Sequence, residues 1–246
     1  FNLSRLEGVF LAKGKVKNII EKELPDVIHS QGLRGDVLAS KFTDEVPVLC
    51  TIRNFPQLDF PMTYGRVIGS IMAYQQIRAL RKVSQVCCVS DAVKDNLEKT
   101  YNINDAVTAL NGVDTLNFYP ADSKQKSSLR KTYGINENSN VWISSLGKDN
   151  RKNSVTVAAA FKLFLTEYPD DTLIFIGDGQ QRGECQKIAA ESSQFKFFGK
   201  VSNVSDYLRM ADYFISASRA EGMPNAVLEA MSCGLPSVLS DIEPHQ

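Results

Sequence analysis

Along the whole chain, segments with the apolar pattern of a strand alternate with segments that have the apolar pattern of a helix. Short, nearly continuous apolar runs predict strands near 27–29, 47–52, 86–89, 106–110, 141–146, 172–176, 195–198, 213–216 and 236–239. Apolar residues spaced three and four apart predict helices near 14–24, 64–82, 91–101, 153–168, 180–192, 204–211 and 224–232. Ser90 is expected to cap the helix 91–101. The alternation of strand and helix predicts parallel sheets covered by helices on both faces.

A polar stretch, 112–128, interrupts this alternation near the middle of the chain. It contains Pro120 and the run DSKQKSS, which are typical of a linker. We therefore expect two Rossmann-like domains that face a cleft, 1–115 and 129–246, joined by a linker at 116–128. Ligands of such sheets bind beyond the carboxyl ends of the strands, so the residues that follow strands are the candidates for function.

Composition excludes several classes of protein. Lys plus Arg and Asp plus Glu each number 28, and this zero net charge argues against a protein that coats nucleic acid. The five cysteines form no C-x-x-C pair, which favours a reducing compartment and hence the cytoplasm. No apolar stretch approaches the roughly 20 residues that span a bilayer. Because the chain opens at Phe1 and stops just after a predicted strand, we expect it to be part of a longer protein.

The segment 217–236, ASRAEGMPNAVLEAMSCGLP, carries the most information. Pro224 suits the first position of a helix and Gly234 suits its end. The helix between them is apolar nearly all round and is expected to be buried, with Glu229 in its middle. A buried carboxylate needs either an internal cation or N–H partner, or the hydroxyl groups of a ligand. Glu221 precedes the helix, where a carboxylate serves equally well as a cap or as a ligand-binding group.

The same block resembles the E-x(7)-E signature of retaining glycosyltransferases with the GT-B fold, especially glycosyltransferase family 4. Glu221 and Glu229 match its two glutamates. The resemblance implies that Glu229 accepts hydrogen bonds from the ribose hydroxyls of a nucleotide-sugar donor. It also implies that the donor sugar is approached by the first glutamate and the loop after it: Glu221, Gly222, Met223, Pro224 and Asn225.

A basic turn, GKDNRKN at 147–153, follows the predicted strand 141–146. A solvated surface loop is the plain interpretation, but the position at a strand end that opens a helix favours phosphate binding. The turn resembles the family's G-R-x(4)-K-G/N motif, with Lys148 at the arginine position and one residue fewer before Lys152. The resemblance implies that Lys148 and Lys152 neutralise the donor diphosphate, so that no metal or other cofactor is needed.

Two further blocks follow strands in the second half. Gly177-Asp178-Gly179 fits a dinucleotide fingerprint poorly, because the third glycine, Gly183, comes one position late. The loop resembles the family's G-x-G loop beside the nucleotide, and Lys200 with Val201 resembles the block near the base. Asn111-Gly112-Val113-Asp114 resembles the run that ends the family's N-terminal domain.

The first half carries weaker candidates. PDVIHSQG resembles the family's P-D-V-I-H-x-H-G block and places His29 at a strand end, while Arg53 and Asn54 stand where many members have a histidine near the donor sugar. The stretch 64–82 combines apolar residues with Arg66, Arg78, Arg81 and Lys82. Such a helix suits an anionic membrane, although an ordinary domain helix with a solvated face is the favoured interpretation.

These observations predict a retaining glycosyltransferase with Glu221, Lys148 and Lys152 as catalytic residues. It would move a sugar from a nucleotide-sugar, of UDP type, to a saccharide or lipid-linked acceptor in cell-surface polysaccharide synthesis. The resemblance assigns retention to front-face attack without a covalent nucleophile. The expected location is cytoplasmic, at the inner face of the membrane, with peripheral membrane contact and no nucleic-acid partner. A GT-B sugar-nucleotide epimerase and a non-catalytic nucleotide-sugar-binding fragment are the alternatives.

Overall fold

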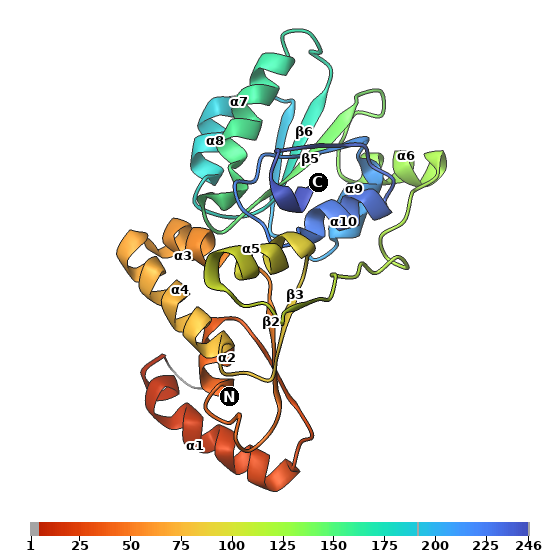
Figure 1. The fold of residues 1–246 in the computed structure, drawn as a ribbon. Helices are drawn as coiled ribbons and strands as arrows, with labels where there is room; N and C mark the ends of the chain where they lie inside the picture. Colours follow the sequence, from red (N-terminus) through yellow and green to blue (C-terminus); the bar gives the residue numbers. More distant parts are fainter. Residues whose placement is uncertain (1–4, 191, 246) are drawn as a thin grey trace. The chain divides into compact units, whose positions relative to one another are not determined.

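The computed structural model describes residues 5–190 and 192–245, with side chains from Leu11 onward. The chain divides into two compact units, Phe1–Leu110 and Asn111–Gln246, each built around one parallel sheet (Figure 1). The division lies directly before the Asn111-Gly112-Val113-Asp114 run.

The first unit has a four-stranded sheet in the order β1-β2-β3-β4. Its strands are β1 (Ile28–Gln31), β2 (Val48–Ile52), β3 (Gln85–Cys88) and β4 (Val107–Thr108). Its helices are α1 (Arg5–Glu23), α2 (Leu33–Ala39), α3 (Pro56–Tyr64), α4 (Arg66–Leu80) and α5 (Asp91–Tyr101). Every strand pairs in parallel with the next one along the chain. Because each strand lies next to the preceding one, each parallel connection is a crossover, and such crossovers are right-handed as a rule.

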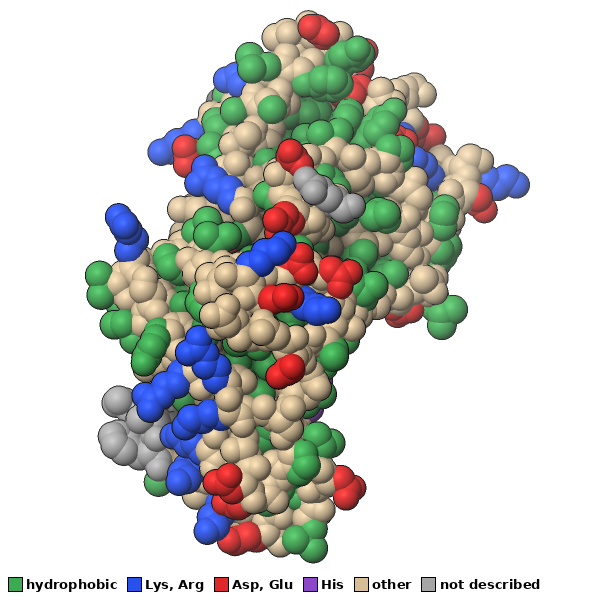
Figure 2. All heavy atoms as spheres, viewed as in Figure 1, with side chains coloured by type: hydrophobic (Ala, Val, Ile, Leu, Met, Phe, Trp, Pro, Cys, Tyr) green, Lys and Arg blue, Asp and Glu red, His purple; other side chains and the backbone are tan. Residues whose placement is uncertain are grey.

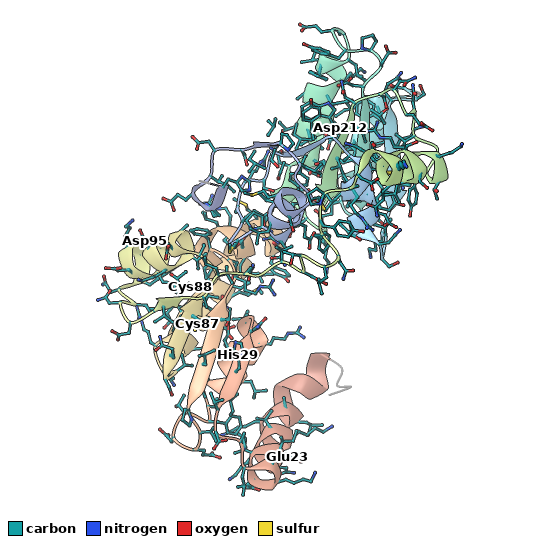
Figure 3. The ribbon with its side chains drawn as sticks, turned by 90° about the vertical axis from the view of Figure 1, so that its right-hand side faces the viewer. Glu23, His29, Cys87, Cys88, Asp95 and Asp212 are labelled. Carbon is teal, nitrogen blue, oxygen red and sulfur yellow. The ribbon has the colours of Figure 1, made fainter. Side chains whose placement is uncertain are left out.

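Buried cysteines contribute to the core of this sheet. Cys87 and Cys88 are neighbours in β3 (Figure 3), and Cys50 in β2 pairs with Val86 next to them. Burial raises the pKa of Cys50 and of Cys88 to about 12. These thiols therefore stay protonated at neutral pH and act as small apolar residues.

The helix expected at 64–82 is α4, and a helix that was not expected, α3, directly precedes it. Gly65 adopts a φ of +84°, which ends α3 and begins α4. A Cβ on Gly69 would lie 2.3 Å from the backbone nitrogen of Pro61, so glycine at 69 lets the two helices pack closely. The prediction of a helix at 64–82 is confirmed within two residues at each end, and α3 was missed.

The second unit has a five-stranded parallel sheet in the order β7-β6-β5-β8-β9. Its strands are β5 (Val141–Leu146), β6 (Thr172–Gly177), β7 (Phe195–Gly199), β8 (Tyr213–Ser216) and β9 (Ser237–Leu239). Its helices are α6 (Ser123–Thr132), α7 (Ser154–Phe164), α8 (Arg182–Ala189), α9 (Val204–Met210) and α10 (Asn225–Ser232), with the 3₁₀ turns η1 (Asn150–Lys152) and η2 (Glu243–His245). The strand order reverses direction between β5 and β8, which makes their carboxyl ends the switch point where ligands of such sheets bind.

The polar stretch expected as a linker contains the start of α6. Asp122 caps this helix by accepting a hydrogen bond from the Gln125 N–H. Lys126 and Arg130 on α6 both form ion pairs with Asp212, at 2.6 and 2.5 Å. Because one carboxylate pairs with both cations, α6 is held beside α9 and the start of β8 although it has few apolar residues. Charge pairing of this kind leaves no hydrophobic period for a sequence pattern to detect.

Candidate functional site

The loops that follow β5 and β8 meet at the switch point of the second unit. The Arg219 N–H, after β8, donates a hydrogen bond to the Arg151 carbonyl, after β5, over 2.8 Å. The two segments that sequence motifs singled out, 147–153 and 217–224, are therefore neighbours, although they are far apart along the chain.

Lys152 and Glu221 form an ion pair between these loops. Their Nζ and Oε1 atoms lie 2.7 Å apart, and the two side chains are 25% and 14% exposed. Ser218, almost entirely buried, donates its hydroxyl to the same Oε1 over 2.9 Å. Glu221 thus has two partners in the loops, and no side chain caps the N-terminus of α10. The structure therefore does not show the capping role that the sequence left open for Glu221.

Ser218 is itself fixed by two further serines, a contact that the sequence motifs did not reveal. Its hydroxyl lies 3.1 Å from that of Ser216, and its carbonyl accepts a hydrogen bond from the Ser240 hydroxyl over 2.6 Å. The serines stand at the ends of β8 and β9, so the sheet holds Glu221 in place through Ser218.

Glu229 stands on α10 without a direct partner. In the described part of the chain its carboxylate forms no hydrogen bond and no ion pair. Burial raises the pKa of Glu229, and the charge of Lys152 offsets this in part. Among the described residues, Lys152 is thus an internal cation that acts on Glu229 through its charge, without a direct hydrogen bond or ion pair.

The burial expected for α10 is only partly correct. Val227 and Ala230 are buried, but Met231 is 62% exposed and Glu229 is half-buried. The expectation of a fully buried helix was wrong because apolar residues on its outer side face solvent. Pro224 occupies the N-cap and not the first helical position. The end is as predicted, since Gly234 has a φ of +74° and its N–H bonds to the Met231 carbonyl.

The glycines of the G-x-G loop are required by close backbone approach. A Cβ on Gly179 would lie 1.7 Å from the Gly147 carbonyl oxygen, and one on Gly177 would lie 2.6 Å from that of Leu146. Gly177 also has a φ of +92°. The loop after β6 therefore lies directly on the basic turn after β5, which puts both at the same end of the sheet.

The cations of the basic turn differ in what they contact. Arg151 donates from Nε to both carboxylate oxygens of Asp149, at 3.1 and 3.0 Å, so its charge is already paired. Lys148 is exposed and has no ion-pair partner among residues 5–190 and 192–245. Arg151 and Lys152 thus each pair with a carboxylate, whereas the charge of Lys148 stays unpaired within the described residues.

The remaining candidates of the second unit lie at the same end of the sheet. Asn111 donates through Nδ2 to the Met223 carbonyl and to the Asn225 side chain, at 3.1 and 2.9 Å, which fixes the loop 222–225. Lys200 is exposed and Val201 half-buried just after β7. Arg182, which motif reasoning missed, lies 3.8 Å from Asp178 as a further cation beside the G-x-G loop.

The candidates of the first unit lie on β1 and just beyond β2. His29 is exposed, and its Nε2 lies 2.7 Å from the Thr51 hydroxyl. Arg53 is exposed and Asn54 half-buried just beyond β2. Arg53 and Asn54 thus follow a strand as expected, whereas His29 lies inside β1, because this strand continues two residues beyond its predicted end at His29.

A buried polar network next to His29 escaped sequence reasoning. Asp36 is fully buried and accepts hydrogen bonds from Ser30 and Gln76, both over 2.7 Å. Burial raises the pKa of Asp36 despite these bonds. The network connects β1, α2 and α4.

No helix of the described segments is long and apolar enough to cross a membrane.

Comparison with protein families gives matches over most of the chain. The profile of the family "Glycosyl transferases group 1" matches residues 137–246, and that of "Glycosyltransferase Family 4" matches residues 1–116. Each profile covers one of the two sheets.

Individual relatives and solved structures agree with these profiles. The chain is 25% identical over 232 residues to the UDP-Gal:alpha-D-GlcNAc-diphosphoundecaprenol alpha-1,3-galactosyltransferase of Escherichia coli, covering 91% of this chain and 60% of that protein. It is 27% identical over 240 residues to the alpha-monoglucosyldiacylglycerol synthase of Streptococcus pneumoniae, covering 91% and 54%. The Anabaena protein HepE, solved with UDP and glucose, superposes with a TM-score of 0.80 at 18% identity, over 98% of this chain and 66% of that one. The chain therefore spans 54–60% of the length of these two curated relatives.

Proposed function

Because the chain belongs to the group 1 glycosyltransferases of the GT-B fold, we propose that it moves a sugar from a UDP-sugar to a saccharide or lipid-linked acceptor. We infer further that the anomeric configuration of the sugar is retained and that the product enters cell-surface polysaccharide or glycolipid synthesis. The main support for this proposal is one cation and two carboxylates, Lys152, Glu221 and Glu229, at the switch point of the second sheet.

Glu229 suits the ribose of the nucleotide. It is a half-buried carboxylate with no hydrogen-bond donor of its own in the described chain. A vicinal diol offers two O–H donors to the two carboxylate oxygens, and hydrogen bonds to a charged group are the stronger kind. The ribose would therefore supply the partners that the protein leaves out.

Lys152 and Lys148 suit the diphosphate. When the bond between the sugar and the diphosphate breaks, negative charge grows on the leaving oxygen and positive charge on the sugar ring. Two ammonium groups fixed at the end of β5 stabilise the leaving group electrostatically. We propose that they do so in place of a metal ion, in which case a chelator such as EDTA leaves turnover unchanged.

Glu221 suits the hydroxyl groups of the donor sugar. In the ligand-free protein it is paired with Lys152, and it keeps its hydrogen bond from Ser218 when that lysine turns to the diphosphate. Its carboxylate then accepts from sugar hydroxyls beside the breaking bond. His29, Arg53 and Asn54 are the first-unit residues that we propose for the side of the donor sugar and acceptor.

The names of the relatives support the class of acceptor. The Escherichia coli relative acts on a diphosphoundecaprenol and the Streptococcus pneumoniae relative makes a diacylglycerol glycolipid, as their names state. We propose an acceptor of the same chemistry, a sugar or hydroxyl group linked to a lipid. The five unpaired, buried cysteines support a reducing, cytoplasmic location at the inner face of the membrane.

A panel of nucleotide sugars tests this proposal. The protein is incubated with UDP- and GDP-linked sugars, with and without polyprenyl-diphosphate or diacylglycerol acceptors, and the product anomer is identified by NMR. Transfer with retained configuration is expected, and it should fall sharply in Glu221→Gln but not in Glu184→Gln, an exposed control on α8. An inverted product contradicts retention, an epimerised nucleotide sugar identifies an epimerase, and binding without turnover identifies a non-catalytic module.

A further inference from the structure

The stretch of chain that leads out of the first unit is attached to both ends of α10. We call residues 111–120, which follow directly on the first unit, the connecting segment. At the start of α10, Asn111 bonds to the loop 222–225. At the end of α10, the Ser232 hydroxyl donates a hydrogen bond to the Phe118 carbonyl. The helix that carries the candidate ribose ligand is therefore fixed on both sides by this segment.

Asn111 uses all of its N–H groups to hold the loop before α10. Its Nδ2 donates to the Met223 carbonyl over 3.1 Å and to the Asn225 Oδ1 over 2.9 Å. Its backbone N–H lies 3.2 Å from the Met223 Sδ, a weak acceptor. A side-chain amide donates twice from one nitrogen without carrying a charge, so asparagine suits a position that must reach two acceptors at once.

The start of α10 lacks the local support that a helix usually has. Its N-cap is Pro224, and among the described residues no side chain accepts a hydrogen bond from the first backbone N–H groups. Asn111 supplies a constraint from a distant part of the chain, because it bonds to the residues on both sides of Pro224. These bonds restrict the conformations that the loop can adopt.

This loop is the part of the site that is expected to approach the donor sugar, whereas Glu229 and Lys152 are proposed for the nucleotide. A ligand that contacts a loop already held in place loses less conformational entropy on binding than one that must order the loop first. The bonds of Asn111 should therefore matter for the sugar and little for the nucleotide.

We propose that Asn111 is a positioning residue for the donor sugar and that it links sugar binding to the junction between the two units. It acts through Met223 and Asn225. The link works in both directions, because a connecting segment that orders the loop is itself ordered, by the same free energy, when a sugar binds. The inference rests on the proposed function for the identity of the ligand, and its first test needs no ligand.

The ligand-free test is amide hydrogen exchange read by mass spectrometry. Asn111→Leu keeps the approximate shape of the side chain and removes both N–H donors. It should speed exchange at Val227 and Leu228, whose N–H groups bond to the Pro224 carbonyl, by roughly 5–150-fold, the equivalent of two neutral hydrogen bonds. A cooperative thermal transition above the assay temperature shows that the variant is folded.

The ligand test compares UDP with UDP-glucose and UDP-galactose by calorimetry. Asn111→Leu should weaken the UDP-sugar that the parent binds more tightly by roughly 5–30-fold, the cost of ordering one residue, and leave UDP within about twofold. Asn111→Gln, which keeps both donors on a longer side chain, should recover part of this loss. In the parent, the UDP-sugar should slow exchange in the connecting segment more than UDP does, and Asn111→Leu should abolish this difference.

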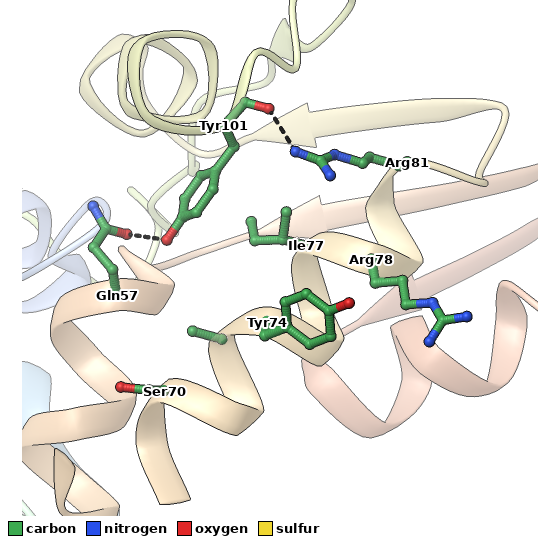
Figure 4. Close-up of a pocket in the computed structure, with 8 residues that line it drawn as sticks. Gln57, Ser70, Tyr74, Ile77, Arg78, Arg81 and Tyr101 are labelled. Carbon is green, nitrogen blue, oxygen red and sulfur yellow. Dashed lines mark hydrogen bonds between the residues drawn. The ribbon is translucent and has the colours of Figure 1, made fainter. Parts of the chain in front are cut away.

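Gln57 offers a matched control in the first unit. Its amide also joins two elements, because it donates to Asn96 and accepts from the Tyr101 hydroxyl over 3.3 Å, which connects α3 with α5 (Figure 4). Gln57→Leu removes an amide from such a contact in the same way. It should leave the affinities for UDP and for the UDP-sugar, and exchange at the start of α10, as they are in the parent.

A second place for anions must be separated from the donor site. Figure 2 shows Lys and Arg side chains gathered over the part of the first unit where α2 and α4 lie. Arg78 and Arg81 line a depression of about 790 Å³ between α3, α4 and α5 (Figure 4), which an anionic nucleotide can enter. The titrations are therefore repeated in Arg78→Gln with Arg81→Gln, where the same affinities are expected.

Four results would overturn the inference. The first is equal loss of UDP and UDP-sugar affinity in Asn111→Leu, and the second is unchanged exchange at the start of α10 in that variant. The third is an equal effect of Gln57→Leu, and the fourth is loss of nucleotide binding in the double arginine variant. A parent that binds neither UDP nor a UDP-sugar would instead refute the proposed function and the link to the sugar with it, while the exchange measurement would still decide whether Asn111 orders the loop.

Discussion

Replacing Lys152 by methionine separates the charge of this side chain from its packing. The Lys152 stem lies against Gly147, where an added Cβ would come within 2.5 Å of its Cγ. Methionine keeps most of that stem and removes only the ammonium. The variant therefore asks whether the ammonium binds the diphosphate of the donor or merely holds the loop in place.

The expected size of the effect follows from the ion pair with Glu221. A hydrogen bond from an ammonium to a diphosphate contributes about 1.5–3 kcal/mol. Before it can form, the pair with Glu221 must open, at a cost of about 1 kcal/mol for partly exposed groups. The net loss in Lys152→Met is then about 0.5–2 kcal/mol, or roughly 2–30-fold in UDP affinity. Uridine, which lacks the diphosphate, should bind both proteins alike.

Glu221→Gln supplies the complementary measurement. It releases Lys152 from its partner, so UDP should bind up to about fivefold more tightly. In the Glu221→Gln background, Lys152→Met should then weaken UDP binding by the full value of about 1.5–3 kcal/mol, because no ion pair has to open. The two effects should differ from additivity by about 1 kcal/mol in this double-mutant cycle.

Calorimetric titration with UDP and with uridine at pH 8 measures these quantities. The pH is chosen because losing the Lys152 charge raises the pKa of Glu229 further, and a protonated Glu229 accepts ribose hydrogen bonds poorly. Lys162→Met, an exposed lysine on α7, is the control. Equal losses of UDP and uridine affinity, or strict additivity of the two substitutions, would refute the reasoning.

Three further substitutions or treatments test other parts of the chain. Glu229→Gln should weaken the binding of UDP by about 1.5–3 kcal/mol and that of a 2′,3′-dideoxy analogue much less, without lowering the melting temperature of the free protein. Equal losses of affinity for both ligands together with a lower melting temperature would indicate a structural role. Burial raises the pKa of Asp212, but the hydrogen bonds from Lys126 and Val141 and the charge of Arg130 outweigh burial, so the pKa is lowered overall. The stability that the ionised Asp212 contributes should therefore be lost as the pH falls through this lowered pKa. Asp212→Ala should cost about 3–5 kcal/mol in urea unfolding by leaving Arg130 buried and unpaired, and a loss under about 1 kcal/mol would contradict this. Cys50 and Cys88 should resist a thiol reagent until the protein unfolds, and rapid labelling at pH 8 would be inconsistent with their burial.

Elements with a strong local signal could be predicted from the sequence. The strands at 141–146, 172–176 and 213–216 were predicted within one residue because they are continuous apolar runs. Ser90 caps α5 as predicted, accepting a hydrogen bond from the Val93 N–H. The rule that ligands bind beyond strand ends directed attention to the loops after β5 and β8 before their contact was known.

Features that depend on distant partners could not be predicted. Helix α3 was missed because Pro56 and Pro61 suggest a break, although Pro61 lies inside the helix. The pair between Lys152 and Glu221, and the support of Glu221 by Ser218, join residues of separate loops. No periodicity records such contacts, so only the folded sheet reveals them. The roles of the site residues in binding and catalysis stay predictions until the substitutions are made.

The strand order of the second unit has a consequence for how this site forms during folding. Strand β8 pairs with β5, yet β6 and β7 come between them along the chain and add to the opposite side of β5. The contact between the loops that carry Lys152 and Glu221 therefore closes a long segment of chain and is expected to form late. A nucleotide that needs both loops can bind only the completed sheet. It would then stabilise the native state by mass action, by about 2.7 kcal/mol at a concentration of 100 times Kd, and leave the early folding steps unaffected.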